Sequence, residues 1–247
     1  MRPEDARPRL AALGFRSADV DTLAEHFLDA ERRGQLGHGL SRIEWLETWD
    51  DLPTEASPAR LVAQPGYERW DGGRGLGYLT LAAVVASQLV EPPEHARLVV
   101  CGKTFPTGSL GYWVRKLADG GLVAVLTATS PRRLAPPGGG PVLAGTNPLA
   151  IAIPSSDGAP VVADVSMGAV THGAVLAGLA RPEELVPFGG EQSHKAFALA
   201  VGLQLFVDAL TSDDGFGAVL LVAQPEADPV PGLRALAGGA RLPGDRR

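Results

Sequence analysis

The clearest pattern in the chain is a stripe of apolar residues at helical spacing near the N-terminus. The positions that form it are Val20, Leu23, Ala24, Phe27 and Leu28. This spacing predicts an amphipathic helix with Ser17 as its N-cap. Gly34 is suited to end that helix, because glycine adopts the left-handed conformation of a C′ residue without strain. The chain then enters a turn at Gly37-His38-Gly39, so we expect His38 at a junction between helix and loop.

Apolar runs bounded by glycine and proline predict the other elements. Helices are expected over 43–58, 76–90, 110–118, 167–180 and 196–210, and strands over 60–64, 67–70, 97–101, 122–127, 161–164 and 217–223, with regular structure of unassigned type around 149–153. The succession of strand, helix and strand over 97–127 is typical of a βαβ unit, which indicates an α/β fold. Helix 196–210 carries apolar residues around most of its surface, so we expect it to be buried on more than one side. Segment 130–154 is rich in proline and glycine, and long ordered loops of this kind usually serve function.

Composition narrows the class of protein. Of the 247 residues 45% are apolar, which is enough for a sizeable core, and the net charge of -6 argues against nucleic acid as a partner. The single cysteine, Cys101, excludes an internal disulfide and lies at the end of a predicted strand, where we expect it to pack. The charged N-terminus leads into no apolar signal segment, and the apolar run 76–90 is too short and too polar to span a bilayer. We therefore expect a cytoplasmic protein that does not enter a membrane.

A histidine between two glycines is the first candidate for chemistry. Arg42 lies four residues after His38, so a titratable group and a fixed cation accompany backbone that a ligand can approach closely. Such a pair suits an anionic substrate, although His38 could also be an ordinary loop or helix-cap residue. Polar clusters farther along the chain could close one pocket with it. They are Gly145-Thr146-Asn147-Pro148, Asp164-Val165-Ser166 and Ser193-His194-Lys195.

Taken together, these clusters resemble the malate/L-lactate dehydrogenase family of NAD(P)-dependent enzymes, typified by L-sulfolactate dehydrogenase. Its R-G-x-x-S-H-G-x-x-R element is similar to residues 33–42, and its D-G glycine segment to 71–77. Its central signature is similar to 127–131, 135–139 and 145–150, and its D-x-S/T, G-H-K-G and C-terminal elements to 164–166, 193–196 and 241–247. These enzymes lack the GxGxxG fingerprint of Rossmann folds, which is also missing here.

The resemblance implies a fold and a division of the chain. The expected fold is a non-Rossmann, malate/L-sulfolactate dehydrogenase-like α/β fold with a mixed sheet, flanking helices and a trimmed dinucleotide region. Residues 1–100 would form an N-terminal helical and substrate part, and 101–225 a central α/β part of cofactor-binding type. Residues 226–247 would form a tail that returns to the N-terminal part.

The resemblance also implies a role for each matched position. His38 would be the general acid, a task suited to a group whose pKa is near neutral, and Arg42 would hold the substrate carboxylate together with Thr146 and Asn147. NADH or NADPH would be bound, without a metal, by Thr129, Ser130, Pro131, Asp164, Val165, Ser166, Ser193, His194 and Lys195. Family members are commonly homodimers, so a homodimer is expected here.

Structural roles are open for several of these residues. Asp164 could cap the helix that begins at Met167, Lys195 could be a solvated side chain, and Asn147 could only form a turn before Pro148. The remaining histidines show no partner pattern and are interpreted as structural. They are His26, His95 and His172.

Three departures from the family pattern bear on function. Gly37 replaces the serine that usually precedes the histidine, and segment 102–108 has no counterpart of the family's second histidine. The segment between Ser166 and His194 is short, and the glycines that flank His-Lys are absent, which hinders close backbone approach to a pyrophosphate. The first hypothesis is an NAD(P)H-dependent reductase of an α-keto acid or cyclic imine carboxylate. The alternative is a non-redox enzyme, such as a cyclase, isomerase or dehydratase, or a binding protein that keeps the fold.

Overall fold

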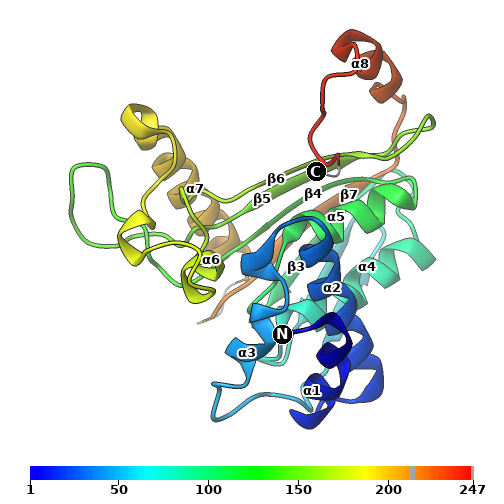
Figure 1. Cartoon of the computed structure of the whole chain (residues 1–247). Helices are drawn as coiled ribbons and strands as arrows, with labels where there is room; N and C mark the ends of the chain where they lie inside the picture. The colour runs from blue at the N-terminus through cyan, green and yellow to red at the C-terminus, as the bar shows by residue number, and fades with distance from the viewer. Residues whose placement is uncertain (212–214, 246–247) are drawn as a thin grey trace.

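The computed structural model describes residues 1–211 and 215–245 (Figure 1). The longer helices are α1 (Ala6–Ala12), α2 (Ser17–Arg32), α4 (Gly77–Val90), α5 (Leu110–Asp119), α7 (Ser193–Thr211) and α8 (Val230–Ala237). The short helices are α3 (Ser41–Leu46), α6 (His172–Leu176), and the 3-10 turns η1 (Pro3–Asp5), η2 (Leu36–His38), η3 (Pro182–Glu184) and η4 (Gly190–Gln192). The strands are β1 (Ala59–Gln64), β2 (Tyr67–Asp71), β3 (Ala96–Gly102), β4 (Val123–Ala128), β5 (Leu149–Ile153), β6 (Val161–Val165) and β7 (Ala218–Ala223).

All of these strands belong to one sheet with the order β1-β2-β3-β7-β4-β5-β6. Strand β2 runs parallel to β3, and every other neighbouring pair is antiparallel. Strands β3 and β4 do form the predicted strand-helix-strand unit with α5, but β7 lies between them and pairs with both. The expected mixed sheet with flanking helices is therefore confirmed.

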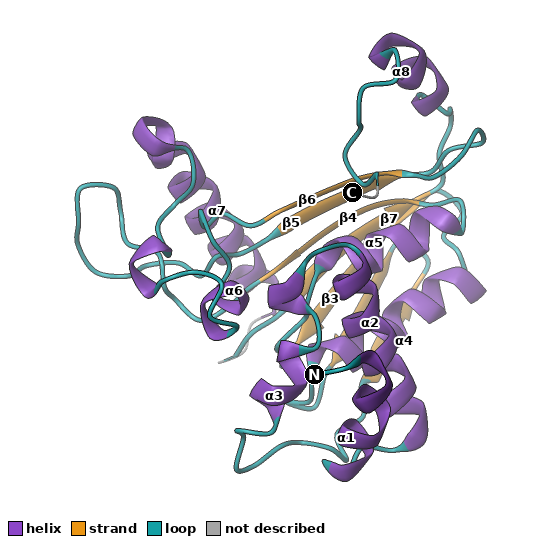
Figure 2. Ribbon diagram, viewed as in Figure 1, coloured by secondary structure: helices purple, strands orange, loops and turns teal. Residues whose placement is uncertain are grey.

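One face of the sheet carries the hydrophobic core. Helices α4 and α5 lie across this face, and α2 packs against both of them (Figures 1 and 2). Trp113, Tyr78 and Phe27 are the largest side chains that are fully buried there. Cys101 is also buried, which raises the pKa of its thiol to about 12. The expected packing role of this cysteine is thus confirmed.

The opposite face of the sheet is only partly covered. Helix α7 contacts β3 and β4 and buries a single stripe of small and polar residues, while Leu199, Leu205 and Phe206 remain exposed. The prediction that this helix is buried on more than one side is therefore wrong. Apolar side chains gathered into a helix need not all face the core, because a surface helix requires only one buried stripe.

Two predicted helices are much shorter than expected. The first, expected over 43–58, is the short helix Ser41–Leu46, and the second, expected over 167–180, is only His172–Leu176. In the second case, Met167 donates its N–H to the Thr146 carbonyl, and Gly168 forms a bridge with Pro187. These long-range bonds use backbone groups that a helix would need. Helix α2 is present as predicted, but the predicted N-cap is wrong: the helix begins at Ser17 itself, Arg16 is its N-cap, and no side chain caps it.

The chain after β7 packs beside the β5–β6 turn. Pro243 accepts a hydrogen bond from the N–H of Val162, and Asp228 accepts hydrogen bonds from Ser156. The division into three parts that the sequence suggests stays a prediction, and Arg246 and Arg247 of its last part lie outside the described residues. Within residues 1–211 and 215–245, no helix is long and apolar enough to cross a membrane.

Candidate active site

A cavity of about 440 Å³ opens at one edge of the sheet. Strands β3, β4 and β6 end at this edge, and β5 and β7 begin there because they run antiparallel to their neighbours. The loops after β3, β4 and β6 and the loop before β5 form one wall, and η2, α3 and the start of α6 form the other. Segments distant in the sequence therefore meet around one cavity, as expected from the polar clusters in the sequence.

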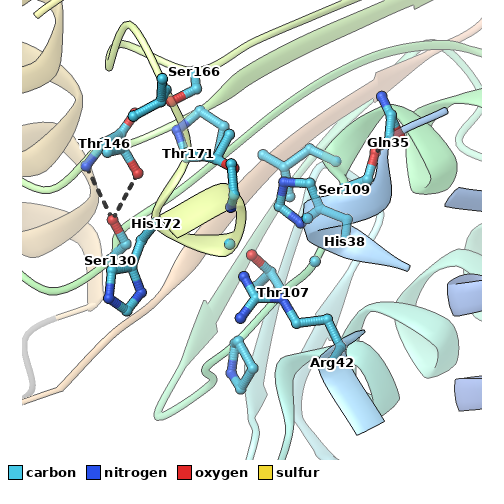
Figure 3. A pocket seen from close by; sticks show the side chains of 18 of the residues that line it. Gln35, His38, Arg42, Thr107, Ser109, Ser130, Thr146, Ser166, Thr171 and His172 are labelled. Carbon is cyan, nitrogen blue, oxygen red and sulfur yellow. Dashed lines mark hydrogen bonds between the residues drawn. The ribbon is translucent and has the colours of Figure 1, made fainter. Parts of the chain in front are cut away.

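His38 lies on the η2 side of this cavity (Figure 3). Helix α2 ends at Arg32, and Gly34 follows with a positive φ of 72°, so the predicted C′ glycine is confirmed. The His38 side chain is half-buried, and its Nδ1 atom is buried without a hydrogen-bond partner among the described residues. Burial, and after it the positive charge of Arg42, lowers the pKa of His38 to about 3. The imidazole is therefore neutral at pH 7 in the free protein, contrary to the near-neutral pKa expected from the sequence.

The glycines on both sides of His38 allow very close packing. A Cβ atom on Gly37 would lie 2.6 Å from the backbone nitrogen of Ala174 in α6. A Cβ atom on Gly39 would overlap the carboxylate of Glu31, which accepts the N–H of Leu40. Glycine therefore occupies the usual serine position because α6 lies where a side chain would be.

Arg42 is the second candidate residue that the structure places in the cavity. Its side chain is 8% exposed, and it forms no ion pair with any residue in the described ranges. The guanidinium carbon lies 4.8 Å from the centre of the Trp45 ring, and Nε has no hydrogen-bond partner among the residues described. Burial lowers the pKa of this guanidinium. A buried cation without a counter-ion is costly, so this position is suited to an anionic ligand.

His172 lines the cavity, although its sequence pattern suggested only a structural role. The view into the cavity shows the Arg42 guanidinium between the His38 and His172 rings (Figure 3). Burial, then Arg133 and Arg42, lower the pKa of His172 to about 4. No local motif marks His172, because only the packing of α6 against η2 brings it to the site.

Tyr78 is a further lining residue that sequence reasoning did not select. It lies in the apolar run that forms α4, where its pattern is that of a core residue. Its hydroxyl is buried without a hydrogen-bond partner in the described part of the chain, and burial raises the pKa of the phenol. An unbonded buried hydroxyl beside a cavity can donate to a bound ligand.

Hydroxyl groups from two loops form the wall opposite Arg42. Thr129, Ser130 and Thr146 line the cavity, and the Ser130 hydroxyl accepts the N–H of Thr146 at 3.1 Å (Figure 3). Asn147 does not line it. Its side chain is fully buried, accepts the N–H of Ser130 and donates to the carbonyl of Ala200 and to Gln204. Asn147 thus ties the two loops to α7 and does not contact the site directly, which corrects the predicted substrate contact.

Asp164 lines the cavity but is already engaged by the protein. Its carboxylate accepts the N–H of Gly111 at 2.8 Å and the hydroxyl of Ser109 at 3.0 Å. Burial raises the pKa of this carboxyl, while these hydrogen bonds act in the opposite direction. Asp164 therefore caps a helix, as the structural alternative proposed, but the helix is α5 and not the one near Met167.

The other predicted cofactor residues separate into two groups. Pro131 and Ser166 line the same cavity as His38. Val165 does not line it, and neither do His194 and Lys195, which are exposed at the start of α7. Ser193 instead lines a second cavity of about 530 Å³. No cluster of metal-ligating side chains occurs within 1–211 or 215–245.

Comparison with known proteins agrees with this arrangement. A sequence profile described as malate/L-lactate dehydrogenase matches residues 6–185. A (2R)-3-sulfolactate dehydrogenase (NADP(+)) from Chromohalobacter salexigens is 32% identical over 170 residues, which cover 68% of this chain and 51% of that protein. A Delta(1)-pyrroline-2-carboxylate/Delta(1)-piperideine-2-carboxylate reductase from Pseudomonas putida is 30% identical over 230 residues, covering 80% and 66%. The chain thus spans about half to two thirds of the length of these relatives.

A solved structure supports the same assignment at the level of the fold. The delta1-piperideine-2-carboxylate reductase from Pseudomonas syringae superposes with a TM-score of 0.84 at 24% identity, covering 99% of this chain and 89% of that one. The profile match includes η2, the central loops and Asp164, and it ends before His194 and Lys195. With the greater part of its length matched by the family profile, the chain belongs to the malate/L-lactate dehydrogenase family.

Proposed function

We propose that the protein is an NAD(P)H-dependent reductase of an α-keto acid or a cyclic imine carboxylate. The observation that carries this proposal is the buried, unpaired Arg42 guanidinium beside His38 in one cavity. A carboxylate would supply the missing negative charge, and the forked guanidinium would fix its orientation. The reducible carbonyl or imine next to that carboxylate would then lie toward His38.

His38 would donate the proton that completes the reduction. In the free protein, burial and the Arg42 charge keep its pKa at about 3, so at pH 7 it is a neutral imidazole that lacks the acidic proton of the imidazolium. A carboxylate on Arg42 offsets that charge and favours the imidazolium. Proton donation would therefore depend on the acidic substrate being bound, since other molecules in the cavity leave His38 neutral.

The cavity can accept a nicotinamide ring next to the substrate. Its volume of about 440 Å³ lies in the range of small-molecule sites, and it is lined by Arg42, His38 and Tyr78, each of which has a buried polar atom without a hydrogen-bond partner among the described residues. Hydroxyls of Ser130 and Thr146 would orient the carboxamide and ribose from the opposite wall, whereas the Thr129 hydroxyl is bonded to the backbone of Gly217. When bound, the reduced nicotinamide supplies the hydride.

Titration of the protein with NADH and NADPH, followed by nicotinamide fluorescence, tests this proposal directly. Saturable binding of one of them, and its oxidation in the presence of a keto acid or cyclic imine carboxylate, is expected. Absence of binding of both at millimolar concentration would contradict the proposal. It would favour the non-redox alternative, which the exposed positions of His194 and Lys195 outside the cavity support.

We also propose that the protein forms a homodimer through the open face of its sheet. Leu221, Val125 and Ile151 lie side by side across three neighbouring strands on this face, and Leu221 is 44% exposed. Leu236 of α8 is 88% exposed and adds apolar surface beyond the sheet. Large exposed apolar areas favour association. Light scattering should give the mass of a dimer for the native protein and of a monomer for Leu221→Lys.

A further inference from the structure

A single arginine separates the cavity that holds His38 from the second cavity. Arg133 lines both, and no other residue in the described ranges does so. Its side chain forms no hydrogen bond or ion pair with residues 1–211 or 215–245, and it is half-buried. Arg133 lies between the segments 127–131 and 135–139 that resemble the family's central signature, so the resemblance implies no role for it.

The backbone holds Arg133 firmly at this junction. Its N–H donates to the carbonyl of Ala144 at 2.8 Å, and the next residue, Leu134, forms an antiparallel bridge with Ala144. Leu134 is fully buried in a small core with Met167 and Ala200. The backbone of Arg133 is therefore a fixed feature of the loop, and the residue lines both cavities from this position.

The second cavity has the character of a site for a flat, uncharged ring. Its walls are mainly proline, glycine and aliphatic side chains, with Phe188 among them, and Arg133 is the only charged residue that lines it in the described part of the chain. Gly138, Gly139 and Gly190 line it in left-handed conformations, with open space where a Cβ atom would be. Bare backbone of this kind lets a ligand approach closely.

These features match the charge distribution of a dinucleotide. In the reduced cofactor, the nicotinamide and adenine rings at the two ends are uncharged, and the negative diphosphate lies between them. We propose that the dinucleotide spans both cavities, with its nicotinamide beside His38, its adenosine in the second cavity, and its diphosphate on the Arg133 guanidinium. This inference rests on the proposed function, and it gives the chain a phosphate-binding cation in place of the exposed Lys195.

The test compares Arg133→Gln with Arg132→Gln. Arg132 is the adjacent arginine, is exposed and lines neither cavity, so it is a matched control. In fluorescence titrations, Arg133→Gln should raise the Kd of NADPH by at least about tenfold, the loss expected for one charge-assisted phosphate contact, and should weaken its dependence on salt. Arg132→Gln should change the Kd by less than about twofold.

Fragments of the cofactor test binding in each of the two cavities separately. ADP-ribose carries the diphosphate and adenosine, so it should compete with NADPH, and Arg133→Gln should weaken that competition by a similar factor. Phe188→Ala should also weaken ADP-ribose but leave the binding of reduced nicotinamide mononucleotide unchanged. Near-ultraviolet circular dichroism checks that each variant is folded.

The possible results lead to separate conclusions. If the native protein binds NADPH and Arg133→Gln binds it equally well, the inference fails and the proposed function stands. The alternative occupant of the Arg133 guanidinium is a second acidic group on the substrate. In that case Arg133→Gln would raise only the KM of doubly charged substrates and leave the Kd of NADPH unchanged, which also overturns the inference. If the native protein binds neither NADH nor NADPH, both proposals fail.

Discussion

Binding of a carboxylate at Arg42 should draw a proton onto His38. The pKa of His38 is lowered to about 3 by burial and by the neighbouring guanidinium. A bound carboxylate neutralises that guanidinium and places a negative charge near the imidazole, and both effects favour the imidazolium. The protein should therefore take up protons from solution when it binds an acidic ligand.

The size of this effect can be worked from the site. A fall in the His38 pKa from 6.5 to about 3 corresponds to roughly 5 kcal/mol, at about 1.4 kcal/mol for each pKa unit. A carboxylate about 4 Å from the imidazolium contributes roughly 4 kcal/mol at an effective dielectric constant of about 20. The pKa in the complex should thus return to about 6, and near pH 6 roughly half a proton should be taken up per site.

Isothermal titration calorimetry measures this uptake. Oxamate, an isostere of an α-keto acid without a reducible carbonyl, is titrated at pH 6 in buffers that differ in ionisation enthalpy. The dependence of the observed enthalpy on the buffer gives the number of protons. His172 also faces Arg42 with a lowered pKa, so it is the rival source of the signal.

Two variants distinguish the histidines. His38→Asn should abolish the buffer dependence, whereas His172→Asn should retain it. No buffer dependence in the native protein between pH 5 and 7, despite measurable binding, would refute the reasoning about the His38 charge. Uptake that persists in His38→Asn and disappears in His172→Asn would transfer the role to His172.

Four further predictions follow from described contacts. Arg42→Met should raise the KM for a carboxylate substrate by about 100-fold, while thermal unfolding of the free protein should be unchanged or occur at higher temperature because an unpaired buried charge is removed. Gly173→Ala would place a Cβ atom against the carbonyl of Gly37, so kcat/KM should fall at least about tenfold, and unchanged kinetics would contradict this packing. Gln204→Leu leaves the N–H of Gly145 and the Asn147 amide without their acceptor and should lower the free energy of unfolding by about 2 kcal/mol in urea titrations. Since folding lowers the pKa of His38, the unfolded chain binds more protons than the folded chain between about pH 6.5 and 3. The contribution of His38 to stability is therefore full above pH 6.5 and is lost as the pH falls. The midpoint of thermal unfolding should accordingly decrease less steeply with acid in His38→Asn than in the native protein.

Local patterns in the sequence were sufficient to predict those elements that are stabilised by residues close to one another in the chain. The apolar stripe and Gly34 predicted α2 and its end, and the strands predicted over 60–64 and 67–70 are β1 and β2. The elements that failed are those where distant bonds compete with local ones. Met167 and Gly168 pair with residues 146 and 187, which no periodicity within 167–180 reveals.

The same distinction between local and distant contacts explains which residues of the candidate site could be predicted. His38 and Arg42 are four residues apart and could be paired from the sequence, and both line the cavity. Tyr78 and His172 come from separate elements and enter the site only through packing, so no spacing could identify them. Asn147 occurs within a matched signature, yet its amide is used by Ser130 and α7, because a signature can be fixed by architecture as well as by ligand contact.

The position of β7 has a consequence for how the molecule folds. Strands β1 to β3 and strands β4 to β6 each form a continuous set, and in the described part of the chain β7 alone pairs with both sets. Residues more than a hundred positions apart must therefore meet before the sheet is continuous, which makes this step slow. Until then β3 and β4 each expose an unpaired edge that can join another chain. We expect the cavity to form late in folding, and aggregation to compete with the docking of β7.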